Sequence, residues 1–348
     1  MIGEFDYTAR PVRVVFGDGR FGALGAEAQR AGLRRIHLIA GQRLSAVAHE
    51  LLGDTVVAHT PTVLQHVPAE EVDKGTAVNR SLQVDGYVAV GGGSAIGLAK
   101  AFALQCPAPI LAVPTTFSGS EMSPIWGTTE NGVKVTGRDD SVAPAVVLYD
   151  PELYAGLPHA TAVTSVFNAM AHAVEALYAA DGSPLVALIA EEAVRLLGGA
   201  VTRFGTAEDR PAKAEAVRGA WLAGMCLGSV SMALHHKICH TLGGTFGLPH
   251  AETHTVMLPY SLAYNAAAAP AAVAAVGRAL GAENPVTALA RLMAAVGAPT
   301  TLCALGFAEH DIEHAVELAT RAPYPNPAPV TPEGIRGLLT AAFHGRLE

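Results

Sequence analysis

Histidines are concentrated in one stretch of the second half of this chain of 348 residues, ALHHKICHTLGGTFGLPHAETH. The stretch holds His235, His236, His240, His250 and His254, and a further histidine, His172, precedes it. Imidazole exchanges protons near neutral pH and is a common ligand of divalent metals. The cluster therefore predicts a site of proton transfer or metal binding. For His235 and His254, a packing role is an equal alternative.

The spacing of these residues indicates how they come together. If the stretch is helical, His236 and His240 lie four residues apart on one face, and Asn168 and His172 have the same spacing. A four-ligand metal site with this arrangement would need a carboxylate at position 168, together with His172, His236 and His250. The neutral amide of Asn168 is a weak ligand for a transition metal. We therefore predict a site that works without a metal ion.

Composition restricts the class of protein. Half of the residues are hydrophobic and 16% are charged, which predicts a large buried core rather than disorder. A net charge of -8, without a basic run with interleaved aromatic residues, argues against nucleic-acid binding. The first residues lack the pattern of a signal peptide, and the apolar stretch 266–276 is short and contains Pro270. We therefore expect a cytoplasmic protein without a membrane-spanning segment.

The order of the predicted elements indicates two domains. Up to about Asp150, predicted strands at 13–16, 36–40, 86–90, 110–113 and 145–149 alternate with helical patterns at 23–31 and 96–105. This alternation predicts a parallel sheet with helices on both faces. Alanine- and leucine-rich helical segments then follow at 160–179, 184–197, 212–233, 271–280, 285–296 and 332–342. We therefore expect an α/β domain at residues 1–157 and an all-helical domain at 158–348.

Two loops at the ends of predicted strands have the residue types of a dinucleotide site. A glycine turn between a strand and a helix lets backbone N–H groups approach a pyrophosphate, and the hydroxyl-rich loop after the strand at 110–113 suits phosphate and ribose. The predicted cofactor-binding residues are Gly91, Gly92, Gly93, Ser94, Thr115, Thr116, Ser118 and Lys134. No GxGxxG fingerprint is present, and Arg43 rather than an acidic residue follows the second strand. Both NADH and NADPH therefore stay open.

These motifs together resemble the iron-containing alcohol dehydrogenase superfamily, and within it the maleylacetate reductases. The resemblance is carried by VVFGDG from Val14, GGGSAIGLAK from Gly91, PTTFSGSEMSPIWG from Pro114, KVTGRD from Lys134, YDPEL from Tyr149, VTSVFNAMAHAVEALY from Val163 and HHKICHTLGGTFGLPHAETH from His235. It implies a Rossmann-like dinucleotide-binding domain that faces a helical domain across a cleft. This fold is shared with dehydroquinate synthase, and the resemblance also implies a homodimer.

An activity is also implied by the resemblance. Maleylacetate reductases use NADH or NADPH to reduce the conjugated carbon–carbon double bond of maleylacetate to 3-oxoadipate in the degradation of aromatic compounds, and no metal is expected. Asn168 and Gly97 stand where metal-dependent members of the superfamily carry aspartate. The correspondence places His172, His236 and His250 at former ligand positions and His240 beside the nicotinamide.

In the implied reaction an enolate forms on a small dicarboxylate substrate, and it needs charge stabilisation and a proton. We expect His240 and His250 to serve as the donor and the general acid, with no division of roles between them, because the substrate carboxylates raise histidine pKa values. His172 and His236 are expected to shape and charge the anion pocket. The expected substrate contacts are Asn168, Phe117, Arg138 and Lys237.

Two positions depart from the family pattern. Ala328 stands where an arginine is expected in an Asn-Pro-Arg-Pro stretch, and Tyr260 stands where a histidine is usual. A related unsaturated or keto acid is therefore an alternative substrate. Three other functions also stay open, namely a metal-dependent alcohol dehydrogenase, a lyase related to dehydroquinate synthase that uses NAD transiently, and a non-catalytic binding protein.

Overall fold

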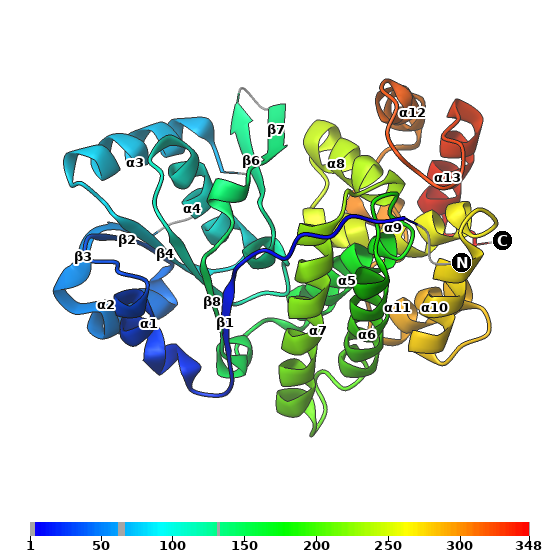
Figure 1. Ribbon diagram of the computed structural model, residues 1–348. Helices are drawn as coiled ribbons and strands as arrows, with labels where there is room; N and C mark the ends of the chain where they lie inside the picture. The colour runs from blue at the N-terminus through cyan, green and yellow to red at the C-terminus, as the bar shows by residue number, and fades with distance from the viewer. Residues whose placement is uncertain (1–3, 62–66, 131–132, 348) are drawn as a thin grey trace. The chain divides into compact units, whose positions relative to one another are not determined.

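A computed structural model describes residues 4–61, 67–130 and 133–347 of the chain (Figure 1). The chain divides into two compact units. The α/β unit runs from Ala9 to Leu157, and the helical unit comprises the residues from Pro158 onward together with the described N-terminal residues up to Thr8. The predicted first domain began at residue 1, whereas residues 4–8 group with the helical unit.

The α/β unit is built on six parallel strands in the order β1-β8-β5-β4-β2-β3. The strands are β1 (Arg13–Phe16), β2 (Ile36–Ala40), β3 (Val56–Thr60), β4 (Gly86–Gly91), β5 (Ile110–Pro114) and β8 (Val146–Tyr149). β2, β5 and β8 are buried along their whole length, because helices cover both faces of a parallel sheet. The predicted α/β fold is confirmed. The edge strand β3 was not predicted, because its VVAHT sequence is only partly buried.

Alternate side chains of the strands enter two separate cores. One core joins Leu38, Val88 and Leu111 to helices α1 (Leu24–Arg30) and α2 (Gln42–Leu52). The other joins Ile39 and Ala89 to helices α3 (Ala69–Ser81) and α4 (Gly93–Gln105). This division follows from the two-residue repeat of a strand. Helices α2 and α3 were not predicted. For α3 the reason is that it buries the polar residues Thr76 and Asn79 together with Val72.

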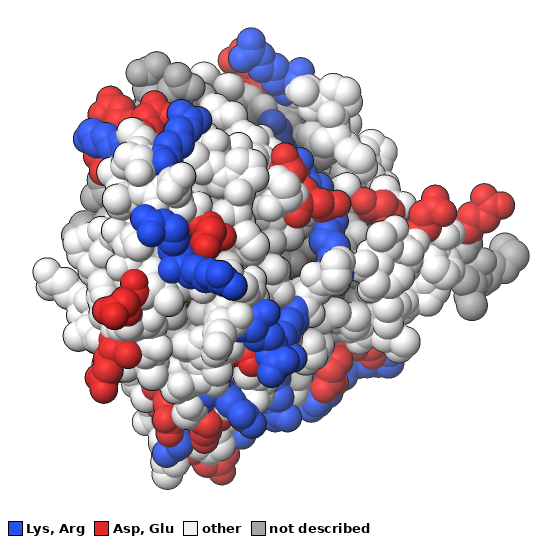
Figure 2. Space-filling view, turned by 60° about the vertical axis from the view of Figure 1, so that its left-hand side comes forward, with Lys and Arg blue, Asp and Glu red and all other residues white. Residues whose placement is uncertain are grey.

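An antiparallel hairpin, also missed from sequence, is formed by β6 (Ile125–Glu130) and β7 (Val133–Arg138). Short 3-10 turns lie at Arg20–Ala23, Gly53–Thr55, Ser120–Met122, Asp140–Val142, Pro151–Tyr154, Cys303–Leu305 and Glu309–Asp311. On the face of the molecule drawn in Figure 2, Lys and Arg side chains are interspersed with Asp and Glu side chains.

The second unit is helical, as predicted. Its helices are α5 (His159–Ala176), α6 (Pro184–Val201), α7 (Asp209–Ser229), α8 (Leu234–Phe246), α9 (His250–Asn265), α10 (Pro270–Leu280), α11 (Pro285–Ala295), α12 (Ile312–Thr320) and α13 (Pro332–His344). A hydroxyl or amide cap followed by proline begins α6, α11 and α13, with Ser183, Asn284 and Thr331 as the capping residues. Residues of α8, α9, α12 and α13 form one hydrophobic core.

The predicted helix at 212–233 is too long at its C-terminal end. Val230 has an extended backbone with φ -131° and ψ 167°, so α7 ends at Ser229 and α8 begins separately at Leu234. In the part of the chain that the structure describes, no single helix has the length and apolar composition to span a bilayer. Helices α7 and α8 meet those criteria only as a pair, and they are bent by 96°.

Candidate active site

Three helices of the helical unit bring the predicted histidines together. Helix α5 carries His172, α8 carries His236 and His240, and α9 begins with His250 and also carries His254. The predicted four-residue spacing on a helix is therefore correct for Asn168 and His172 on α5 and for His236 and His240 on α8. The rings of His172 and His236 stack with centroids 5.1 Å apart, and those of His240 and His250 stack at 6.1 Å.

His254 lies at the centre of this histidine cluster. Its ring centroid is 4.4 Å from that of His250, 4.8 Å from His236, 4.9 Å from His235, 6.3 Å from His172 and 6.4 Å from His240. Its side chain is fully buried, and that of His235 is 1% exposed. Both residues, for which the sequence left a packing role open, belong to the cluster.

A hydrogen-bonded chain supports the centre of the cluster. His235 Nε2 lies 2.9 Å from His254 Nδ1, and His235 Nδ1 lies 3.2 Å from the Ser261 hydroxyl oxygen. The pKa of His235 is lowered to about 3 and the pKa of His254 well below its usual value, mainly by burial. Neighbouring histidines act in the same direction, and Glu175 opposes the shift of His235. Burial has the same effect on the pKa of His172, with His236 and His250 adding to it. These three rings are therefore neutral at pH 7.

Glu175, on α5, is a functional candidate that sequence reasoning missed. Its side chain is fully buried. One carboxylate oxygen accepts the His235 backbone N–H at 2.8 Å, and the other pairs with His236 Nδ1. Burial acts to raise the pKa of Glu175, but the interactions with His236 and His235 hold it below the usual value. Glu175 lies three residues after His172, and this helical spacing was the available signal.

Four buried polar atoms in the cluster lack a hydrogen-bond partner. They are Asn168 Oδ1, His172 Nδ1, His236 Nε2 and His254 Nε2. An unpaired buried polar atom costs roughly 1–3 kcal/mol, so a group of four marks a place that a ligand or ordered water completes. Solvent reaches the cluster from one side, where His250 is exposed and His240 is half-buried. Asn168, His172 and His236 are buried.

The four implied metal-ligand positions, Asn168, His172, His236 and His250, include no acidic ligand. Asn168 supplies a neutral amide. Three side chains, His235, Cys239 and His254, do bring potential ligand atoms within 4.8 Å of one another. They are the group of three or more such His, Cys, Asp or Glu side chains found among the described residues. The set of His172, His236 and His250 is therefore not gathered at ligand spacing. In the gathered group, the bond between His235 Nε2 and His254 Nδ1 already occupies two ligand atoms.

The structure places the predicted substrate contacts in different surroundings. Phe117 is fully buried and stacks on Tyr154 with ring centroids 4.9 Å apart, so it belongs to the core of the α/β unit. Lys237 lies half-buried on α8 among the cluster residues, whereas Arg138 is exposed on β7 in the α/β unit. Lys134 is also on β7, but its side chain lies outside the described residues.

The two departures from the family pattern both contribute to packing in the helical unit. Tyr260 is 5% exposed and belongs to the core of α8, α9, α12 and α13. The backbone N–H of Ala328 donates to Asn265 Oδ1 at 3.2 Å, and Asn326 exchanges side-chain hydrogen bonds with the same Asn265. The substitutions at 260 and 328 therefore lie in packed segments of the unit.

The glycine loop, Gly91–Ser94, joins β4 to α4 as predicted. Gly92 is the N-cap of α4 and provides no side-chain cap, so the first N–H groups of the helix are available to an anion. The loop touches the hydroxyl loop, Thr115–Ser120. A Cβ atom at Gly92 would come within 3.0 Å of the Thr116 hydroxyl, and one at Gly97 would meet Val67 at 3.3 Å. The first contact explains why glycine occupies position 92 in the turn, and the second explains why a small residue occupies position 97 inside α4.

Behind the two loops lies a buried charged network. Lys100 is fully buried on α4 and donates to the carbonyl oxygens of Ser120, Ser123 and Ile125 at 2.6, 2.7 and 2.8 Å. Burial lowers the pKa of Lys100 to about 7, and Glu121 opposes the shift. Glu121 accepts hydrogen bonds from the hydroxyls of Tyr149 at 2.9 Å and Ser118 at 3.1 Å, and burial raises its pKa. The Ser118 hydroxyl proton is thus directed at Glu121 rather than at a ligand.

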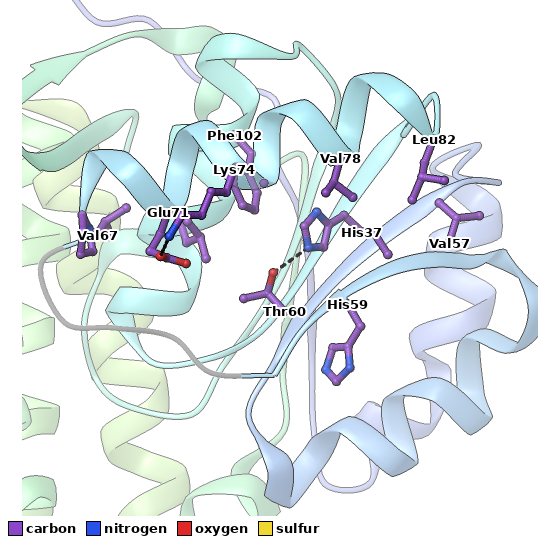
Figure 3. Close-up of a pocket in the computed structure, with 14 residues that line it drawn as sticks. His37, Val57, His59, Thr60, Val67, Glu71, Lys74, Val78, Leu82 and Phe102 are labelled. Carbon is purple, nitrogen blue, oxygen red and sulfur yellow. Dashed lines mark hydrogen bonds and ion pairs between the residues drawn. The ribbon is translucent and has the colours of Figure 1, made fainter.

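A cavity of about 330 Å³ in the α/β unit lies apart from these features. Figure 3 shows two pairs among its polar side chains, His37 bonded to Thr60 at 2.8 Å and Lys74 bonded to Glu71 at 2.7 Å, and His59 bonds to the Ala40 carbonyl at 3.1 Å. Among the described residues that line it, none has a buried side-chain nitrogen or oxygen without a partner. The cavity shares no lining residue with the glycine loop or the histidine cluster, so we do not assign the reaction to it.

Comparison with known proteins places both units in one family. Residues 11–151 match the family model described as iron-containing alcohol dehydrogenase, and residues 161–343 match the C-terminal model of the same family. The chain is similar to maleylacetate reductases from Sphingobium indicum (46% identity over 346 residues, 98% of each chain) and Pseudomonas sp. strain P51 (48% over 337 residues, 96% of each chain). It is also similar to the crystal structure of maleylacetate reductase from Agrobacterium tumefaciens, with a TM-score of 0.94, 42% identity and 99% of each chain covered. The chain therefore belongs to the iron-containing alcohol dehydrogenase family and is an oxidoreductase.

Proposed function

We propose that the enzyme reduces the conjugated carbon–carbon double bond of maleylacetate, or of a closely related unsaturated keto acid, to the 3-oxoadipate-type product in the degradation of aromatic compounds. The observation that carries the proposal is the histidine cluster with Asn168, an amide, at the position where a metal ligand is expected. The full-length similarity to maleylacetate reductases supports the choice of substrate.

The proposed cofactor is NADH or NADPH, held by the glycine loop and the hydroxyl loop. When bound, the reduced nicotinamide supplies a hydride to the alkene carbon beta to the substrate ketone. The free N–H groups at the start of α4 suit the pyrophosphate. Arg43, which follows β2, donates to the Leu153 carbonyl at 3.3 Å and leaves both a free ribose hydroxyl and a 2′-phosphate possible.

The proposed proton donors are His240 and His250. The substrate enolate needs a hydrogen-bond donor at its oxygen and a proton at its carbon. The two rings stack at the more accessible side of the cluster, where a dianionic substrate would raise the pKa values of both. His172, His236 and Asn168 form the buried wall behind them. Because that wall offers no acidic ligand, we propose that proton donors take the place of a metal ion.

The test is an assay with purified enzyme, maleylacetate and either NADH or NADPH. We expect loss of the absorbance of the reduced nicotinamide, matched mole for mole by 3-oxoadipate in the mass spectrum. A reaction that turns over substrate with no net change in absorbance would instead indicate the dehydroquinate synthase-like lyase. Binding of neither nucleotide would indicate a non-catalytic protein.

A second candidate function is a metal-dependent alcohol dehydrogenase. It is favoured by the unpartnered atoms Asn168 Oδ1 and His236 Nε2, which are both able to accept a cation. Oxidation of simple alcohols that requires added ferrous or zinc ion would support it. A homodimer, a cytoplasmic location and the absence of nucleic-acid and membrane partners stay predictions, which chromatography with light scattering and cell fractionation would test.

A further inference from the structure

Lys100 makes an unusual set of contacts for a lysine. Its side chain has no exposed surface, and its three shortest hydrogen bonds all go to backbone carbonyl oxygens, those of Ser120, Ser123 and Ile125. An ammonium group has three hydrogens and no acceptor. The three carbonyls therefore use its full donor capacity, and the hydroxyls of Ser120 and Ser123 lie farther away at 3.3 and 3.4 Å.

These contacts connect the two predicted nucleotide loops. Lys100 lies on α4, the helix that begins at Gly93 in the glycine loop. Its acceptors lie in the segment that starts with the last residue of the hydroxyl loop, Ser120. The loops also touch directly, since the Thr115 N–H donates to the Gly91 carbonyl at 3.0 Å. Lys100 therefore adds a buried side-chain link between the two loops to this direct backbone contact.

Glu121 completes the connection from the other side. It lies in the segment held by Lys100, and it accepts hydrogen bonds from Tyr149 on β8 and from Ser118 in the hydroxyl loop. Both of its oxygens are thus used within the α/β unit. The segment is held by a buried cation and a buried carboxylate, and neither residue is needed to contact a ligand.

We propose that Lys100 is a positioning residue for dinucleotide binding, which sets the spacing between the glycine loop and the hydroxyl loop. The inference rests on the proposed use of NADH or NADPH. A loop that shifts by a fraction of an ångström loses contacts with the phosphates, so cofactor affinity depends on a residue that never touches the cofactor.

The test compares three variants in NADH titrations followed by fluorescence. Lys100→Met has a similar length but donates no hydrogen bond, and Lys100→Gln keeps two donor hydrogens. The matched control is Lys74→Met on α3, whose side chain is 70% exposed and pairs with Glu71. We expect the NADH Kd to rise about tenfold or more in Lys100→Met, the usual effect of losing a residue that orients a binding site without touching the ligand. Lys100→Gln should lie between Lys100→Met and wild type, and the control should match wild type.

Steady-state kinetics separate positioning from a purely structural role. Positioning raises the KM for NADH and leaves kcat at saturating NADH close to wild type, whereas a structural role lowers the melting temperature with the same KM. If Lys100→Met does not fold, Lys100→Gln carries the same comparison. Tight NADH binding by wild type and equal Kd values in the folded variants would overturn this inference alone. Wild-type enzyme that binds neither nucleotide would overturn the proposed function and this inference together.

Discussion

Each unit of the enzyme buries a carboxylate among polar groups, and the two surroundings differ in how completely they are satisfied. In the α/β unit, Glu121 accepts hydrogen bonds from two hydroxyls, and nearby Lys100 uses all three of its hydrogens. In the helical unit, Glu175 is also fully bonded, but the histidines and the asparagine around it leave four buried polar atoms without partners.

This difference in hydrogen bonding distinguishes a supporting role from a catalytic one. A buried polar network with every group paired is rigid and stabilising, whereas a partly paired network costs free energy until a ligand or water completes it. We therefore infer that the Lys100 network supports the nucleotide loops and that the histidine cluster binds the substrate.

The largest effect is expected from His250→Ala and His240→Ala. Each should lower kcat by about 100- to 10,000-fold, because each removes a positioned proton donor. NADH affinity should change far less than kcat, since the nucleotide loops belong to the α/β unit. His310→Ala is the matched control, because the His310 side chain is 86% exposed. Near-normal kcat in both cluster variants would remove the histidine cluster from the chemistry.

Stability should fall as the solution is acidified below pH 6.5, the ordinary histidine pKa. Burial lowers the pKa values of His172, His235 and His254 in the folded state, so below pH 6.5 the unfolded chain binds more protons than the folded one. Three such groups together reduce the free energy of unfolding by up to about 4 kcal/mol per pH unit. Glu121 acts oppositely, because its raised pKa favours the folded state at low pH and that contribution is lost as the pH rises.

Urea unfolding at a series of pH values measures this dependence. His235→Gln should reduce the slope by roughly a third, since one of three titrating groups is removed. An unchanged slope in that variant would mean that His235 is already protonated in the folded protein.

Glu175→Gln should lower kcat by about 10- to 100-fold, the usual effect of removing a group that orients a functional histidine. The His235 backbone N–H can only donate, so the new amide must turn its oxygen toward it. The amide nitrogen then faces His236 Nδ1 and forces the ring proton onto Nε2. Nitrogen-15 NMR of the His236 ring detects this change of tautomer. The control is Glu192→Gln, because the Glu192 carboxylate pairs with Arg195 at the surface. Wild-type kcat together with an unchanged tautomer would contradict the role given to Glu175.

The smallest effect is expected from Phe117→Leu. The ring is buried against Tyr154, so the change should cost roughly 1 kcal/mol of stability through lost packing. The KM for maleylacetate should not change. A raised KM without loss of stability would return Phe117 to the substrate site.

Sequence periodicity predicted the central strands and most of the helices of the second unit, because burial on both faces or along one stripe leaves a clear pattern. It missed β3 and the β6–β7 hairpin, which are short and partly buried. It also gave no separate prediction for α9, which contains Pro259 and is buried over most of its surface, so neither a stripe nor an uninterrupted run marks it.

For the candidate site, the sequence likewise predicted the residues that share a helix face but not those that depend on tertiary packing. Residue types and helical spacing brought Asn168, His172, His236 and His240 together correctly. Glu175 was missed because a carboxylate in an alanine-rich helix is ordinary in sequence, and only tertiary packing places it against α8. The burial of Phe117 against Tyr154 could not be predicted, because a phenylalanine between hydroxyl residues carries no signal for which way its ring turns.

The most direct test of the proton-based reaction is the rate of NADH oxidation with maleylacetate after exhaustive chelation, measured on enzyme whose metal content is determined in parallel. The neutral amide of Asn168 and the separated ring nitrogens predict full activity with less than one metal ion per chain. Loss of activity on chelation, with recovery on adding ferrous or zinc ion, would contradict it.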